Sequence, residues 1–168
     1  MTNSNKNALK YPQVQKMLNH VPLILRNFPP EELRSFLLCG QFEEYETAEN
    51  ILSKTDDVIN DGILVVEGSI DILLNNILTA NLRAGDFTGE TFLFSSSAFR
   101  GNLVTTSPTA IFRYKKARIL DFFEHRSERL FKIFIMNILE VQQEKLNQAT
   151  QKILNLQKKL IQSTNINF

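Results

Sequence analysis

The spacing of apolar residues changes twice along this chain, and each change predicts a different kind of structure. Between residues 14 and 28, apolar side chains recur at helical spacing; they are Val14, Met17, Leu18, Val21 and Leu25. Pro29 and Pro30 interrupt this pattern, and Pro30 suits the first turn of a second helix. Gly40 predicts the end of that second helix, whose apolar face consists of Leu33, Phe36, Leu37 and Leu38.

Between residues 41 and 112 the pattern becomes one of short strands separated by turn residues. The runs with strand character cover residues 62–68, 70–73, 77–82, 103–106 and 109–112. Asn75-Asn76 predicts a tight turn between the second and third runs, and Ser107-Pro108 predicts a turn that joins the last two as a strand pair. Many short strands with no long helix between them predict a small antiparallel sandwich or jelly roll.

After Tyr114 the spacing becomes helical again. A short amphipathic helix ends near His125 and presents Ala117, Ile119, Leu120, Phe122 and Phe123. A long helix follows from about Ser127, which is a candidate N-cap. Within this helix, one apolar residue falls every seven positions, at Leu139, Leu146, Ile153 and Leu160.

The heptad predicts a modest seam between two copies of the chain. Its companion positions are only half apolar; they are Gln142, Ala149, Leu156 and Ser163. The alternative is a single helix that packs on its own barrel. That alternative explains Phe131, Ile135 and Ile138, but it explains less well the apolar residues beyond Leu146, where a small sandwich has no more surface to cover.

These elements predict an α+β fold, an antiparallel β-roll (jelly roll) with N-terminal helices and a long C-terminal helix. We divide the chain into an N-terminal helical segment (1–40), the β-roll (41–113) and the C-terminal helices (114–168). The length of 168 residues suits one domain, or one domain with an appendage.

Composition narrows the class of partner. The formal net charge of +1 gives none of the basic excess expected of a protein that binds nucleic acid through phosphates. The polar N-terminus is not a signal peptide, and no run of about 18 apolar residues predicts a membrane span. The single cysteine, Cys39, allows no internal disulfide, which fits a reducing compartment. We therefore expect a cytoplasmic protein with no membrane partner.

The stretch GDFTGETFLFSSSAFRGN, residues 85–102, carries the clearest chemistry. Gly89 and Glu90 stand at the start of a predicted helical turn, whose free N–H groups suit a phosphate. If the loop folds back, Arg100 can neutralise that phosphate. Glu90 repels phosphate, so a sugar hydroxyl is its natural partner, and the combination suits a nucleotide. The alternative is a surface ion pair between Glu90 and Arg100.

This stretch resembles the phosphate-binding cassette of the cyclic nucleotide-binding domains, a family that includes the catabolite activator protein and the regulatory subunits of cAMP-dependent protein kinase. Residues 85–90 match its Gly-Asp-x-x-Gly-Glu without a gap, and Arg100 falls at the spacing of the bacterial activator. Upstream, residues 65–70 resemble the family's hydrophobic-x-Gly-x-hydrophobic strand turn. The resemblance spans about Leu33 to Leu156 and has the same order of elements.

The resemblance implies a role for each matched residue. The implied ligand-binding residues of the cassette are Thr88, Gly89, Glu90, Thr91, Arg100, Gly101 and Asn102. The backbone of Gly89, Thr91 and Gly101 and the side chain of Arg100 would hold the cyclic phosphate. Glu90 would accept a hydrogen bond from the ribose 2′-hydroxyl.

Alignment of the long helix with that of the activator places Gln142 and Gln143 against the base. A glutamine amide both donates and accepts hydrogen bonds, so it can pair with a purine edge. The alternative is that the two glutamines are solvated or set the register of the seam. The resemblance implies a cyclic nucleotide as the ligand. cAMP is the first candidate, and cGMP or another cyclic nucleotide is the alternative.

The leading hypothesis is a stand-alone receptor for cAMP that dimerises through its long helix and presents a changed surface to an unknown downstream protein. Only eight residues follow Leu160, so we expect no DNA-binding module and no nucleic-acid partner for this chain alone. Gly101 and Asn102 depart from the family's small hydroxyl or alanine residues. They motivate the alternative of a degenerate domain that acts as a ligand-free dimerisation or scaffold module.

Nothing in the sequence indicates an enzyme. His20 and His125 have no nearby cysteine or second histidine at metal-ligand spacing. Glu90 has no nucleophile or metal set beside it, so we do not assign it the role of a catalytic base.

Overall fold

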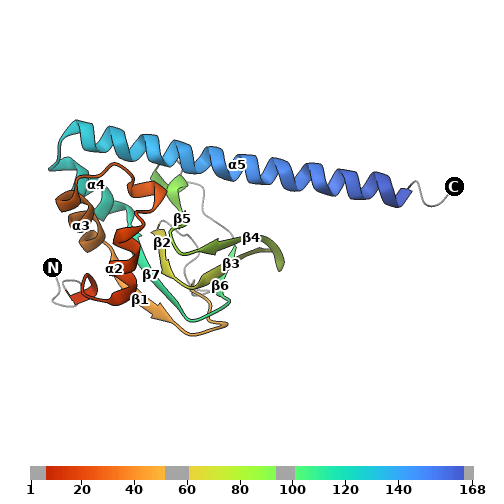
Figure 1. The fold of residues 1–168 in the computed structure, drawn as a ribbon, viewed down its shortest axis with the longest axis horizontal. Helices are drawn as coiled ribbons and strands as arrows, with labels where there is room; N and C mark the ends of the chain where they lie inside the picture. The colour runs from red at the N-terminus through yellow and green to blue at the C-terminus, as the bar shows by residue number, and fades with distance from the viewer. Residues whose placement is uncertain (1–6, 52–60, 94–100, 165–168) are drawn as a thin grey trace.

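The computed structural model describes residues 7–51, 61–93 and 101–164. It shows an α+β fold in which a β-roll is covered at one end by helices, and a long C-terminal helix lies across both and extends past them (Figure 1). The predicted fold class is therefore confirmed.

Three helical elements of the N-terminal segment lie wholly within the described residues. They are α2 (Pro12–Asn19), η1 (Leu23–Leu25) and α3 (Pro30–Cys39). The helical spacing predicted between residues 14 and 28 is split, because Pro22 disfavours helical geometry at Val21 and lacks an N–H group. Gly40 ends α3 as predicted. A Cβ atom at Gly40 would lie 2.8 Å from the ring of Tyr114, so only glycine fits there.

The roll consists of two antiparallel sheets. One has the order β1-β7-β2-β5 and the other the order β4-β3-β6. The strands are β1 (Gln41–Tyr45), β2 (Asp61–Glu67), β3 (Ser69–Leu74), β4 (Ile77–Arg83), β5 (Phe87–Thr88), β6 (Asn102–Thr105) and β7 (Thr109–Lys115). The tight turn between β3 and β4 is confirmed, because Asn75 and Asn76 adopt φ angles of 50° and 62°.

The predicted pairing of the last two strands is wrong. β6 pairs with β3, whereas β7 pairs with β1 and β2, so the chain crosses from one sheet to the other around Ser107-Pro108. The hydroxyl of Thr109 stabilises the crossing, since it lies 2.7 Å from the carbonyl of Ser107 and 3.2 Å from that of Ser69. A turn signal between two apolar runs does not distinguish a hairpin from a step between sheets.

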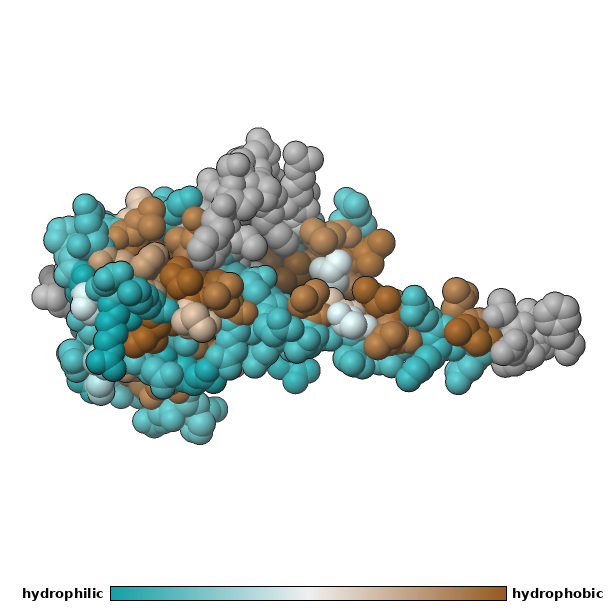
Figure 2. All heavy atoms as spheres, turned by 90° about the horizontal axis from the view of Figure 1, so that it is seen from above, coloured by the Kyte–Doolittle hydropathy of each residue, from teal (hydrophilic) through white to brown (hydrophobic). Residues whose placement is uncertain are grey.

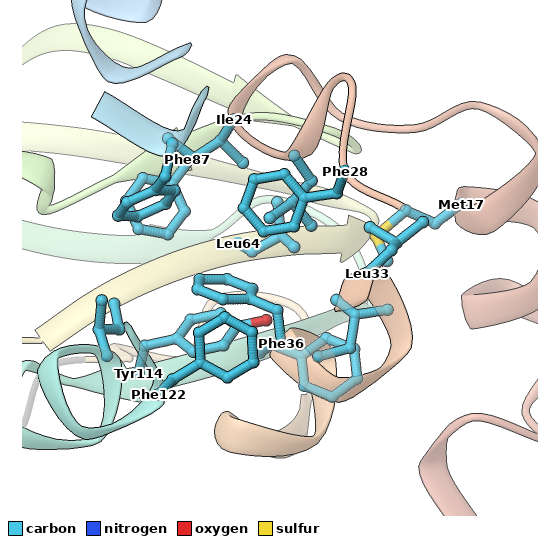
Figure 3. Packing of buried hydrophobic residues seen from close by; sticks show 14 of the residues in the cluster. Met17, Ile24, Phe28, Leu33, Phe36, Leu64, Phe87, Tyr114 and Phe122 are labelled. Atoms are coloured by element: carbon cyan, nitrogen blue, oxygen red, sulfur yellow. The ribbon is translucent and has the colours of Figure 1, made fainter. Parts of the chain in front are cut away.

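Strand β2 has both faces covered, which explains its unbroken apolar run. Ile63 and Val65 lie in the cluster between the two sheets. Leu64 and Val66 lie in a larger cluster beneath the helices. Figure 3 shows this larger cluster, in which Phe36 is central and stacks on Tyr114 with ring centroids 5.0 Å apart.

The C-terminal part folds as the two predicted helices, α4 (Lys116–Glu124) and α5 (Glu128–Thr164). Ser127 caps α5, because its hydroxyl accepts a hydrogen bond from the N–H of Leu130 at 3.3 Å. The first part of α5 packs into the larger cluster through Leu130, Phe134 and Ile138. The buried side chain of Asn137 joins α5 to η1 through the carbonyls of Ile24 and Arg26, at 3.2 and 2.7 Å.

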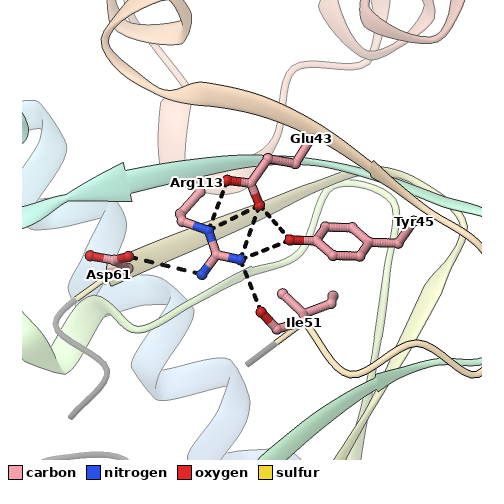
Figure 4. A network of polar contacts seen from close by, with 5 residues as sticks. All are labelled: Glu43, Tyr45, Ile51, Asp61 and Arg113. Atoms are coloured by element: carbon pink, nitrogen blue, oxygen red, sulfur yellow. Dashed lines mark hydrogen bonds and ion pairs between the residues drawn. The ribbon is translucent and has the colours of Figure 1, made fainter. Parts of the chain in front are cut away.

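Arg113 of β7 joins β1, β2 and the chain at Ile51, on the face of the first sheet that also carries Ile63 and Ile111 (Figure 4). Its Nε lies 3.0 Å from both carboxylate oxygens of Glu43, and Nη2 donates to the hydroxyl of Tyr45 and the carbonyl of Ile51, both at 3.0 Å. Asp61 lies 3.9 Å from Nη1. Burial lowers the pKa of Arg113, but Glu43 and Tyr45 more than offset it, so the pKa is raised. The guanidinium therefore stays charged and fastens β1, β7 and the start of β2.

Candidate functional site

The turn that begins the cassette is fixed to strand β2. Gly85 adopts a φ of 93°, and its N–H donates to the carbonyl of Val65 at 2.9 Å. The carboxylate of Asp86 accepts from the N–H of Arg83 at 2.8 Å. The carbonyl of Asp86 accepts from the N–H of Val65 at 3.0 Å. Gly85 and Asp86 thus form a turn that directs β5 back along β2.

Gly89 brings the chain against the start of β2. Its φ is 87°, and an added Cβ atom would lie 2.3 Å from the carbonyl oxygen of Asp61. Both observations require glycine at this position. The chain then forms the 3-10 helix η2 (Glu90–Leu93), which begins with Glu90, as the predicted helical turn requires.

Glu90 is the buried charge of the site. Only 3% of it is exposed. Its Oε1 atom accepts hydrogen bonds from the amide of Gln142 and from the ammonium of Lys145, both on α5. Its Oε2 atom is buried and has no hydrogen-bond partner among the described residues. The carboxylate therefore keeps one unused acceptor in the interior, where such a group is costly unless a donor reaches it.

Lys145 connects α5 to the cassette at two points. Its ammonium forms an ion pair with Glu90 and also donates to the carbonyl of Phe87 at 2.9 Å. An ammonium carries three N–H donors, and these contacts use two of them. The side chain is about one-third exposed, at 36%, so the ion pair is buried on the side of Glu90 and open on the side of Lys145.

A cavity of about 380 Å³ lies between α5 and the roll. This volume is within the range of about 300–1,000 Å³ that is common for small-molecule sites. Apolar side chains from five elements form much of its wall, namely Ile24, Ile72, Leu82, Phe87 and Val141. Its polar side chains are Thr79, Asn81, Asp86, Thr88, Glu144, Lys145, Gln148 and Lys152.

The structure brings some of the predicted site residues to this cavity and leaves others apart. Thr88 lines the cavity, whereas Glu90 lies behind Lys145 and is not part of the wall. Gln142 reaches Glu90. Gln143 is exposed and bonds to Asn147 at 3.0 Å, away from Glu90.

The second half of the cassette is described only from Gly101 onward. Gly101 is half-buried just before β6, and Asn102 begins β6 opposite Leu73 of β3. Arg100 and the loop before it lie outside the described residues, as does the side chain of Thr91. The predicted closure of Arg100 onto Gly89 therefore remains a prediction.

Lys145 was not among the residues predicted from the sequence to form the site. Its partner Glu90 lies 55 positions earlier, so no local pattern joins them. The available signal was helical spacing, because Lys145 follows Gln142 by three positions and precedes Lys152 by seven, which places all three near one side of α5.

Other reactive groups lie away from the cavity. Burial raises the pKa of the Cys39 thiol from 9.0 to about 11, and the thiol donates to the carbonyl of Ser35 at 3.3 Å. Asp121, Glu124 and His125 lie within 4.8 Å of one another at the exposed end of α4. In the part of the chain that the structure describes, no helix combines the length and apolar character needed to cross a bilayer.

Comparison with known proteins supports the fold. No protein-family profile matches this chain, and no curated protein is similar to it in sequence. A cyclic nucleotide-binding domain from Methylobacillus flagellatus KT superposes with a TM-score of 0.71 at 15% identity, over 89% of this chain and 94% of that one. The catabolite activator protein of Thermus thermophilus superposes with a TM-score of 0.64 at 18% identity, over 80% of this chain.

The cAMP-bound structure of PfPKA-R superposes with a TM-score of 0.62 at 15% identity, over 86% of this chain. This chain spans 63% of the Thermus protein and 49% of the PfPKA-R structure. Identities this low establish the fold and not the ligand. The chain thus has the fold of the cyclic nucleotide-binding domains, which the resemblance of its sequence predicted.

Proposed function

We propose that this chain is a receptor domain, and not an enzyme, that binds a cyclic nucleotide in the cavity between the roll and α5. The observation that carries the proposal is the position of the cavity of about 380 Å³ beside the Gly85–Glu90 cassette, in a fold shared with cyclic nucleotide-binding domains. cAMP is the first candidate, since a neighbour in this fold was solved with cAMP bound.

The chemistry of the site suits each part of such a ligand. Phe87, Leu82 and Val141 provide apolar surface for a base. The unused Oε2 of Glu90 can accept a hydrogen bond from a ribose hydroxyl. The resemblance of the cassette assigns the phosphate to the backbone near Gly89 and to the guanidinium of Arg100.

Calorimetry with cAMP, cGMP and cyclic dinucleotides tests this proposal. We expect the wild type to bind cAMP at sub-millimolar concentration and Arg100→Ala to bind it at least about tenfold more weakly, because a charge-assisted bond to phosphate is lost. Arg118→Ala is the matched control, since Arg118 is an exposed arginine on α4. If no cyclic nucleotide binds, or if Arg100→Ala binds as the wild type does, the receptor proposal is wrong.

We propose further that two copies associate through α5. Past the body of the protein, apolar side chains gather along this helix (Figure 2). The four heptad residues are 55–66% exposed; they are Leu139, Leu146, Ile153 and Leu160. A regular apolar heptad on one helix fits the same heptad on a second copy, which makes this chain itself the proposed occupant.

Sedimentation velocity tests the association. The triple variant Leu146→Glu, Ile153→Glu and Leu160→Glu should be monomeric at concentrations where the wild type is a dimer. The control places the same three charges on the polar side of the helix, at Gln151, Asn155 and Gln162, and should remain a dimer. A wild type that is monomeric at high micromolar concentration contradicts the proposal.

A second candidate function is that of a ligand-free scaffold. It is favoured by one observation, that Lys145 already neutralises Glu90 without any ligand. Thermal unfolding separates the two functions, because a ligand at 100 times its Kd adds about 2.7 kcal/mol to the free energy of unfolding. A transition temperature that no cyclic nucleotide changes favours the scaffold.

A further inference from the structure

The contact between α5 and the rest of the protein changes character along the helix. Val141 is its last buried residue within the described part of the chain. Beyond it, three polar side chains reach from α5 to the roll. Gln142 and Lys145 bond to Glu90, and Lys152 donates to the carbonyl of Thr79 at 3.0 Å. Where α5 passes over the cavity, polar side chains hold it to the roll. A polar ligand can replace these contacts.

Lys145 separates Glu90 from the cavity. Lys145 is part of the cavity wall, together with Phe87 and Thr88, whereas Glu90 is almost fully buried behind it. The donors that Glu90 receives come from α5 and occupy Oε1. A ligand in the cavity must therefore displace the ammonium before its own hydroxyl can reach this carboxylate.

We infer that Lys145 is an internal competitor for Glu90, and that ligand binding exchanges its ion pair for a bond between Glu90 and a ligand hydroxyl. The inference rests on the proposed function. The exchange removes the ion pair between α5 and the cassette, so α5 is held less tightly to the roll over residues 142–149 when the ligand binds. Because the ligand must first break this contact, its apparent affinity is lower than its affinity for the same cavity without the ion pair.

The same contact makes a hydroxyl donor a requirement for the ligand. A ligand without a donor for Glu90 would displace Lys145 and leave a buried carboxylate without its cation, with only the amide of Gln142 as a donor, which is costly. Lys145 and Glu90 together thus select ligands with a free hydroxyl beside the phosphate. A ribose 3′,5′-cyclic phosphate has that arrangement, and its 2′-deoxy analogue does not.

Two lysines on one wall of the cavity provide the ligand-binding test. Lys145→Met and Lys152→Met each remove one positive charge from the wall, but only Lys145 contacts Glu90 in the structure. Each variant loses the same general attraction of a lysine for an anionic ligand. A difference in affinity between the two variants therefore reports the contact of Lys145 with Glu90. By calorimetry, we expect Lys145→Met to bind cAMP about tenfold more tightly than Lys152→Met. Equal or weaker binding overturns the inference.

A second measurement needs no ligand. Amide hydrogen exchange over residues 142–149 should be faster in Lys145→Met than in the wild type, and Lys145→Arg should restore slow exchange. Glu90→Gln removes the ion pair with almost no change of volume and should also raise the exchange rate, which keeps the test decisive if Lys145→Met folds poorly. Unchanged exchange in Glu90→Gln would show that the ion pair does not fasten α5.

The two measurements fail in different ways. If neither lysine variant nor the wild type binds any cyclic nucleotide, the proposed function and the ligand exchange fall together. The hydrogen-exchange result still decides whether Lys145 holds α5 against the roll. If cAMP binds but exchange over residues 142–149 is the same with and without it, the receptor function survives and the release of α5 is wrong.

Discussion

At the scale of single residues, neighbours in the cassette have separate tasks. Gly89 allows the chain to approach β2 closely, with Asp61 as the nearest obstacle to any side chain. Glu90 follows directly and receives its donors from α5. Gly89 thus lets the chain place Glu90 in the interior, and Lys145 supplies the charge that makes burial of its carboxylate tolerable.

Replacement of Gly89 by alanine should destabilise the fold strongly. The new Cβ atom would lie 2.3 Å from a backbone oxygen, and the φ of 87° adds strain. We expect a loss of about 3 kcal/mol or more in the free energy of unfolding, measured by urea denaturation. Gly85→Ala is the control, because its φ of 93° gives similar strain but no atom lies within 4 Å of the new Cβ. Equal losses in the two variants would contradict the role given to Asp61.

The thiol of Cys39 should react slowly. Burial raises its pKa to about 11, two units above its ordinary 9.0, so at pH 8 the reactive thiolate is about 100-fold less abundant than for an ordinary thiol. We expect alkylation by iodoacetamide to be slower by at least that factor in the native protein than in the protein unfolded in guanidinium chloride. Similar rates in the two states would show that the thiol is not buried as described.

At the scale of elements, the positions of the helices and strands were predicted from sequence patterns more accurately than the pairing of the strands. The glycine-bounded run 62–68 corresponds to β2, and Asn75-Asn76 forms the tight turn between β3 and β4, because both signals are local. The partners of β6 and β7 could not be predicted, because the choice between sheets depends on contacts with β1, β2 and β3. The ion pair between Glu90 and Lys145 was missed for the same reason.

Arg113 should be important for stability, since it binds groups from β1, from β2 and from Ile51, which lies beside β6. Replacement by methionine leaves Glu43 without its cation in a partly buried position. We expect a loss of about 2–4 kcal/mol in the free energy of unfolding, measured by chemical denaturation. Arg118→Met removes an exposed arginine from α4 and should change stability by less than about 0.5 kcal/mol. If Arg113→Met changes the free energy of unfolding as little as Arg118→Met does, the polar network in Figure 4 contributes little to stability.

At the scale of the whole molecule, one helix takes part in three features. The start of α5 completes the larger core through Phe134 and Ile138. Its middle closes the cavity through Lys145 and Lys152, and its end presents the exposed heptad. A ligand that changes the middle of α5 would therefore change the position of the end, which connects the proposed binding site to the proposed surface for a second copy.

The most direct test of the account is calorimetric titration of cAMP into the wild type and a variant with a filled cavity. Gln148 lines the cavity and Gln151, three positions further along α5, does not, so Gln148→Trp and Gln151→Trp form a matched pair. We predict that the wild type and Gln151→Trp bind cAMP equally, and that Gln148→Trp binds it at least about tenfold more weakly. Absence of binding to the wild type, or equal binding to all three proteins, would contradict the claim that a cyclic nucleotide occupies this cavity.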